Sequence, residues 1–119
     1  MAYVIIQQGE NMKTGDQEPN LVLRLFKKNN NPEDLSSIND VSVYIAETGF
    51  DQLTVDDNTA GAVSVSDADS GEVTYEWQAG DTDNPGTYVG EVGVEFTSGE
   101  TKTFPSSGTF NIYVEEALK

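Results

Sequence analysis

Hydrophobic and polar residues alternate with a period of two along most of this chain. The alternation is clearest in five stretches, at residues 21–26, 41–46, 73–77, 88–96 and 110–114. Such a period is typical of strands with one buried face, and little of the chain repeats at the 3.6-residue period of a helix. Weaker strand patterns occur at 3–7, 53–55, 62–66 and 101–104, and we expect 53–55 and 62–66 at sheet edges. The chain is predicted to be all-β, an antiparallel sandwich of about seven or eight strands.

Turn-forming residues separate the predicted strands, at 9–19, 29–32, 48–50, 56–61, 98–99 and 105–108. Ser98-Gly99 predicts a hairpin that joins 88–96 to an antiparallel strand at 101–104. Pro105 to Gly108 predicts a bulge or kink before the last strand. The segment from Pro32 to Ile38 is predicted to be a short helical turn or a loop.

A tight turn stands directly before the longest predicted strand. The turn is Asn84-Pro85-Gly86, and Tyr88 follows two residues later. This spacing is typical of the tyrosine corner of immunoglobulin-like sandwiches, in which the hydroxyl bonds back to upstream backbone, although a generic hairpin turn is the alternative. Gly90 occupies the place of the second cysteine of antibody domains, so the pattern favours the broad immunoglobulin-like class.

Several short motifs also occur in a characteristic order. They are Lys13-Thr14-Gly15-Asp16, Pro32-Glu33-Asp34-Leu35, Gly71 to Trp77, Asp81-Thr82, Pro85 to Tyr88, Thr103 to Ser106 and Phe110 to Val114. In this order they resemble the immunoglobulin-like domain at the N-terminus of phage baseplate upper proteins, which is also found in small virion proteins of tailed viruses. The chain departs from that pattern by extra residues at 7–12 and by having no receptor-binding domain after residue 119. The resemblance implies a structural β-domain of a virion.

The charge is strongly acidic and unevenly distributed. The formal net charge is −15, from 21 acidic and 6 basic residues, and no Lys or Arg lies between Lys28 and Lys102. We do not expect direct binding to nucleic acid, because such binding needs clustered cations, and binding to anionic membrane surfaces is disfavoured as well. We interpret the surface as adaptation to concentrated salt, where the Debye length falls to about 3 Å at 1 M. An ordinary acidic surface, calcium capture and DNA mimicry are the alternatives.

The residue types leave little room for catalysis. The chain has no cysteine and no histidine, which excludes thiolate or imidazole metal sites and the usual nucleophile pairs. The segment Asp67 to Glu72 lacks the ligand spacing of an EF-hand loop. The Asp81-Thr82-Asp83 segment is interpreted as a turn in which Asp bonds nearby backbone. We therefore predict no enzyme activity, no catalytic residue, no cofactor and no metal site.

Candidate protein contacts are one terminal segment and two aromatic side chains. Tyr3, Val4, Ile5 and Ile6 could pair with a neighbouring sheet edge, or could simply form the first strand of this domain. Tyr44 and Tyr113 alternate out of phase with the aliphatic residues of their strands and are expected to face outward. Tyr75 and Trp77 alternate in phase with Val73 and are expected in the core.

These observations favour a single domain over residues 1–119, with residues 1–19 as a possible contact arm. We expect a structural protein of a tailed virus of a halophilic host, made in the host cytoplasm and located in the virion. Its expected partners are other virion proteins and copies of itself, with self-association that strengthens with salt. A halophile cell-surface adhesion or carbohydrate-binding module and an acidic DNA-mimic inhibitor are the alternatives. We expect binding where the surface departs from its acidic character. These places are the cations near both ends of the sequence and the outward-facing aromatic residues.

Overall fold

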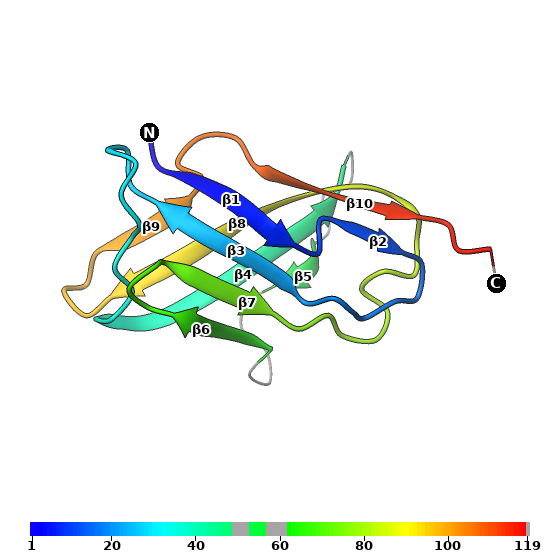
Figure 1. The fold of residues 1–119 in the computed structure, drawn as a ribbon, viewed down its shortest axis with the longest axis horizontal. Coiled ribbons are helices and arrows are strands. Elements are labelled where there is room, and N and C mark those ends of the chain that lie inside the picture. The colour runs from blue at the N-terminus through cyan, green and yellow to red at the C-terminus, as the bar shows by residue number, and fades with distance from the viewer. Residues whose placement is uncertain (49–52, 57–61, 119) are drawn as a thin grey trace.

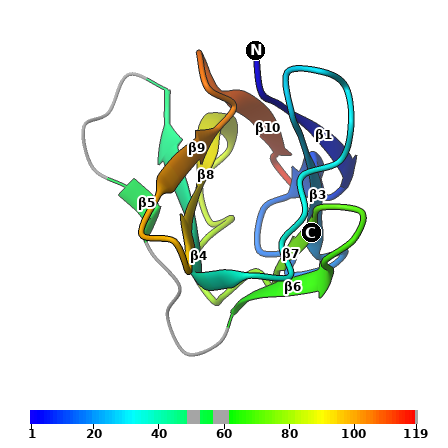
Figure 2. The same ribbon diagram turned by 90° about the vertical axis from the view of Figure 1, so that its left-hand side faces the viewer.

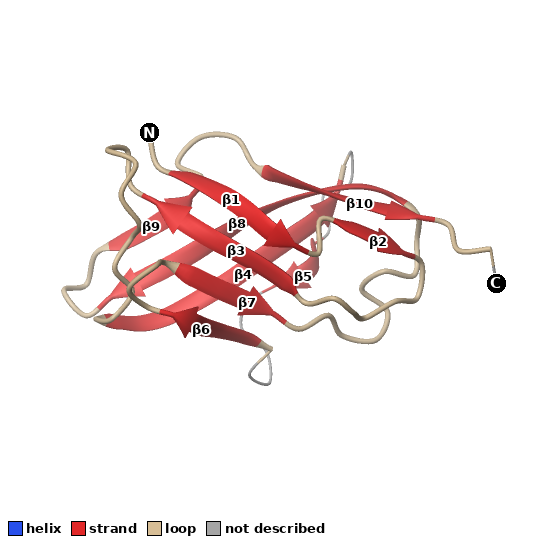
Figure 3. Ribbon diagram, viewed as in Figure 1, coloured by secondary structure: helices blue, strands red, loops and turns tan. Residues whose placement is uncertain are grey.

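A computed structural model describes residues 1–48, 53–56 and 62–118, with the backbone alone at 53–56. All regular elements among these residues are strands, arranged in two sheets that pack face to face (Figure 3). The molecule is elongated, with extents of 46 × 27 × 24 Å. No helix in the described ranges is long and apolar enough to cross a membrane. The predicted all-β class is confirmed.

The two sheets are shown in Figure 1. The smaller one has the order β1-β3-β7-β6, built from β1 (Tyr3–Gln8), β3 (Leu21–Phe26), β7 (Glu72–Tyr75) and β6 (Val63–Asp67). The larger one has the order β2-β10-β8-β4-β5, built from β2 (Asn11–Lys13), β10 (Phe110–Glu115), β8 (Gly86–Phe96), β4 (Ile38–Glu47) and β5 (Leu53–Asp56). The remaining strand, β9 (Thr101–Phe104), also pairs with β8.

This strand order is that of an immunoglobulin-like sandwich. The sheet β1-β3-β7-β6 corresponds to strands A, B, E and D of that fold, and β10-β8-β4 corresponds to G, F and C. The chain passes from one sheet to the other between β1, which pairs antiparallel with β3, and β2, which pairs parallel with β10. The expected edge positions of β5 and β6 are confirmed.

The core lies between the sheets and is built from the inward positions that the alternation predicted. Leu21, Leu23 and Leu25 of β3 are completely buried, and they face the inward residues of β4, β8 and β10. Tyr75 and Trp77 are buried as predicted, with their rings in an edge-to-face arrangement at a centroid distance of 5.4 Å. Each sheet therefore contributes one apolar face to a single core.

The structure corrects one sequence-based expectation and decides between the two alternatives of another. The segment 9–19, predicted to be a polar loop, contains β2, so the described residues form ten strands instead of seven or eight. Sequence reasoning missed β2 because Met12 is its only apolar residue, and its pairing partner β10 lies about 100 residues away. For the segment 32–38, predicted as a short helical turn or a loop, the structure shows a loop that runs from the bridge between Phe26 and Pro32 to the start of β4 at Ile38. The predicted turns at 48–50 and 56–61 lie mostly outside the described residues.

The return strand along β8 is interrupted as predicted. The register pairs Phe104 of β9 with Val92 and Phe110 of β10 with Gly90. Residues 105–109 therefore bulge out of the sheet, because six steps along this strand match only two along β8. The predicted hairpin at Ser98-Gly99 is also present, with the Gly99 amide donating to the Phe96 carbonyl at 2.9 Å.

The tyrosine corner is confirmed by a specific hydrogen bond. The buried Tyr88 hydroxyl donates to the backbone carbonyl of Asn84 at 2.6 Å, so the turn is not a generic hairpin. Burial, together with the nearby Glu47 and Asp83 carboxylates, raises the pKa of Tyr88. This bond ties the start of β8 to the loop that precedes it.

Replacing Tyr88 by phenylalanine is expected to lower the free energy of unfolding by about 0.5–1.5 kcal/mol, because only the hydrogen bond is lost while the buried ring remains. Urea-induced unfolding measures the change. Tyr113→Phe is the matched control, because it removes the same hydroxyl from a tyrosine that is 43% exposed. Equal stability of Y88F and Y113F would contradict a stabilising corner.

Candidate protein-binding groove

Cations from both ends of the sequence meet at one end of the sandwich. Lys27 and Lys28 follow β3, while Lys102 belongs to β9, and all three line a groove of about 580 Å³. Seen from this end of the molecule, β9 lies on one side and the start of β1 with the loop after β3 on the other (Figure 2). We call this feature the lysine groove. It is lined by Met1, Ala2, Lys27, Lys28, Asn29, Glu33, Lys102, Thr103, Phe104 and Ser106.

The loop that carries Lys27 and Lys28 is held by a tight turn. The Lys27 amide donates to the Asn31 carbonyl at 2.8 Å, and the Asn30 amide donates to the Lys27 carbonyl at 2.9 Å. Asn30 has a φ of 71°, a left-handed conformation that Asn tolerates better than most residues. The Asn30 side chain also accepts a hydrogen bond from the Tyr3 hydroxyl at 3.1 Å. The first strand therefore supports the lysine loop.

A buried carboxylate joins the two walls of the lysine groove. The Glu33 side chain is 5% exposed, and its Oε1 lies 3.0 Å from Lys102 Nζ while its Oε2 lies 4.0 Å from Lys27 Nζ. The Glu33 amide donates to the Leu25 carbonyl at 2.9 Å, which fixes the backbone beneath the carboxylate. A buried charge needs such partners, so Glu33 orients two ammonium groups that stand at the groove rim.

Lys28 differs from its two neighbours. Within the described part of the chain it makes no ion pair, and its side chain is exposed. Lys102 has further contacts, since its Nζ lies 3.9 Å from Glu100 and 5.4 Å from the centroid of the Phe96 ring. Among the three lysines of the groove, Lys28 is thus the one with no ion pair to the described residues.

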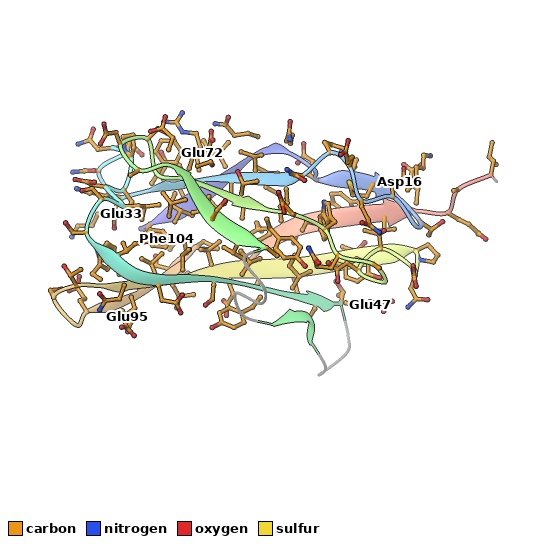
Figure 4. All side chains as sticks on the ribbon, turned by 90° about the horizontal axis from the view of Figure 1, so that it is seen from below. Asp16, Glu33, Glu47, Glu72, Glu95 and Phe104 are labelled. Atoms are coloured by element: carbon orange, nitrogen blue, oxygen red, sulfur yellow. The ribbon has the colours of Figure 1, made fainter. Side chains whose placement is uncertain are left out.

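The floor of the lysine groove is apolar. Phe104 is completely buried there, between the two sheets, and Figure 4 shows it at the same end of the molecule as Glu33. Ala2 is held beside it, because the Ala2 amide donates to Ser106 Oγ at 3.1 Å and the Ser106 amide donates to the Ala2 carbonyl at 3.2 Å. An apolar floor with a cationic rim suits a ligand that carries both apolar and anionic groups.

The segment predicted as a contact borders this groove. Tyr3 to Ile6 belong to β1, the first strand of the domain, which pairs only with β3 among the described strands and therefore has a free edge. On its outer face Ile5 is 47% exposed, and the Tyr3 ring stacks on Phe26 at 5.0 Å. Val4 and Ile6 pack toward the core instead. Strand pairing at this edge stays a prediction.

The two predicted aromatic contacts lie elsewhere. Tyr44 and Tyr113 stand on the outer face of the larger sheet and are not brought together with β1. Tyr113 is exposed, as expected, whereas Tyr44 is half-buried because its ring covers Gly93. Tyr44 also lines a shallow hollow of about 270 Å³ with Asp40, Ser42 and Glu95.

The acidic loops act as turns. Asp81 accepts hydrogen bonds from the Gln78 amide at 2.8 Å and from the Tyr75 hydroxyl, as predicted for its turn role. Burial, with this hydrogen bond, raises the pKa of Tyr75. In the Asp67 to Glu72 loop, Asp67 accepts from the Ser70 amide at 3.4 Å. Among the described residues no group of acidic side chains could hold a metal ion.

Sequence reasoning singled out the cations near both ends but missed Glu33. Glu33 and Leu35 are both buried and lie two residues apart, so the period of two continues through a segment that contains a charged residue. This alternation was the sequence signal that could have identified Glu33 as a buried residue. The lysine groove thus combines three ammonium groups, one buried carboxylate and an apolar floor.

Comparisons with known proteins bear on the fold. No family model matches this sequence, and no curated protein matches it. The structure is similar to CopC from Methylosinus trichosporium OB3b, with a TM-score of 0.57, 12% identity, and coverage of 100% of this chain and 98% of that chain. Murine CRIg aligns over 97% of this chain and 98% of its own at 14% identity, but its TM-score of 0.39 is too low to establish a shared fold. The strand order already identifies the chain as an immunoglobulin-like β-sandwich, and at 12% identity the likeness to CopC extends to the fold alone.

Proposed function

We propose that this chain is a non-enzymatic structural protein of a tailed virus particle and that it acts by binding neighbouring proteins. The observation that carries the binding role is the lysine groove. In a chain of net charge −15, three of six cations gather around an apolar floor at one end, beside the free edge of β1. Because these cations are concentrated on an otherwise negative surface, they direct an acidic partner to that end of the molecule.

The virion location is supported by the ordered motifs that resemble the baseplate domain, and the acidic span between Lys28 and Lys102 supports a halophilic host. In such a solvent, salt screens repulsion between copies, while carboxylates keep the surface hydrated. The role requires no cofactor, no nucleic acid and no membrane.

The test is mass spectrometry of purified virus particles with heads and tails separated. We expect the chain in one fraction at many copies, and carbodiimide treatment should cross-link Lys28 to a carboxylate of a neighbouring protein. Absence from every particle fraction would contradict the virion role. Tight competition with DNA for a cellular protein would favour the DNA-mimic alternative, and glycan binding would favour the adhesion alternative.

A further inference from the structure

The lysine groove calls for an extended ligand of defined chemistry. Its floor presents Ala2 over the completely buried Phe104, and its rim carries the free ammonium of Lys28 beside the paired Lys102. A segment with an apolar side chain for the floor and a carboxylate for the rim would match both features. An apolar segment alone would leave Lys28 unpaired.

The chain carries a segment of this kind at its opposite end. Residues 116–118, Glu-Ala-Leu, follow β10, and both Glu116 and Leu118 are exposed, Leu118 completely. Nothing in the described part of the chain covers the Leu118 side chain. The lysine groove and this segment lie at the two ends of the long axis, which excludes insertion of the segment into its own groove (Figure 1).

The base of this C-terminal segment is anchored, so its direction is defined. The Thr14 amide donates to the Glu115 carbonyl at 2.8 Å, and the Ala117 amide donates to Thr14 Oγ1 at 2.9 Å. Lys13 Nζ lies 2.7 Å from Glu115 Oε2 and lowers the pKa of that carboxyl. A segment whose base is held in place loses less conformational entropy on binding than a free tail.

We propose that the lysine groove of one copy binds the C-terminal segment of a second copy, head to tail, with Leu118 on the apolar floor and Glu116 at Lys28. This inference rests on the assembly role proposed above and names the partner. Because the two surfaces differ, the interface is heterologous, and repetition generates a ring or a filament instead of a closed dimer.

Salt acts on this association in two ways. Screening removes the repulsion between two copies of net charge −15, and it also weakens the single exposed pair of Lys28 and Glu116. A single exposed pair contributes little to affinity, and that contribution is small beside the repulsion between two highly charged domains. We expect association to be stronger in about 1 M KCl than in about 0.1 M KCl.

The test is sedimentation velocity of the whole chain in about 1 M KCl over a range of concentrations. The average mass should rise with concentration beyond that of a dimer. Lys28→Glu and Glu116→Lys should each raise the dissociation constant on the order of tenfold, since each replaces attraction by repulsion. Mixing the two variants should restore assembly, because a carboxylate then meets an ammonium at every contact between unlike copies.

An apolar substitution and its control complete the test. Leu118→Ser should raise the dissociation constant about 10- to 100-fold, in proportion to the lost burial of a leucine side chain. Val22→Thr, which changes a half-buried apolar residue of β3 outside the groove, the C-terminal segment and β1, should leave it unchanged. A monomer at all concentrations, a mass that stops at the dimer, loss of assembly in V22T, or no restoration on mixing would overturn the head-to-tail contact. Detection of the chain in virus particles would still support the proposed function in each of those cases.

Discussion

Phe104→Ala is expected to lower the free energy of unfolding by about 3–5 kcal/mol, a large part of the 5–15 kcal/mol typical of a folded domain. Phe104 is the largest of the completely buried side chains, and it lies where β9 ends and the bulge begins. Truncation removes buried apolar area and leaves a cavity between the sheets. The surrounding strands cannot close that cavity, because β9 is held in register with β8.

Urea-induced unfolding in about 1 M KCl measures this change, because salt screens the self-repulsion of both proteins and so helps even the destabilised variant to start from the folded state. Phe96→Ala is the control, since Phe96 is half-buried and its ring packs beside Lys102 at the surface. A smaller loss is expected there. Equal losses of stability in F104A and F96A would contradict the conclusion that Phe104 packs against both sheets.

Gly71→Ala is expected to cost about 2–5 kcal/mol, from two sources that add. Gly71 has a φ of 70°, which disfavours any residue with a Cβ atom. A Cβ atom at this position would also lie 2.6 Å from the Leu25 carbonyl oxygen and 2.9 Å from the Glu33 carbonyl oxygen. Both neighbours are backbone atoms, so they cannot rotate away, and the segment that carries Glu33 would have to move.

Gly99→Ala separates the two sources. Gly99 has a φ of 92°, but nothing lies within 4 Å of a Cβ atom built there, so only the backbone strain of about 1–2 kcal/mol remains. Unfolding curves of the two variants measure the difference between them. Hydrogen exchange should also accelerate at the Glu33 amide in G71A, because its bond to the Leu25 carbonyl is disturbed. Equal losses in G71A and G99A would refute the close backbone contact.

The features that the sequence predicted correctly depend on residues close together in the chain. Alternation located β3, β4, β8 and β10, because a period of two places every second side chain on the same face. The corner at Asn84 to Tyr88 was predictable because a hydroxyl and a carbonyl four residues apart meet across one turn. Tyr75 and Trp77 were assigned to the core by their phase with Val73.

Features that depend on distant residues could not be predicted in this way. Gly90 is an example, because a Cβ atom there would lie 2.5 Å from the Phe110 ring, so the place of an antibody cysteine is filled by an aromatic side chain from the paired strand. The alternation of β8 contains no information about which residue of β10 lies opposite Gly90.

The candidate site shows the same division. Composition and spacing along the chain determined that the cations lie near the two ends and that the middle of the chain is acidic. Only the tertiary structure decided that Lys27 and Lys102 share the carboxylate of Glu33 above Phe104, while Lys13 pairs with Glu115 at the other end of the molecule. The physical reason is that register between strands places these side chains, and register is set by packing of the whole sandwich, which no local pattern encodes.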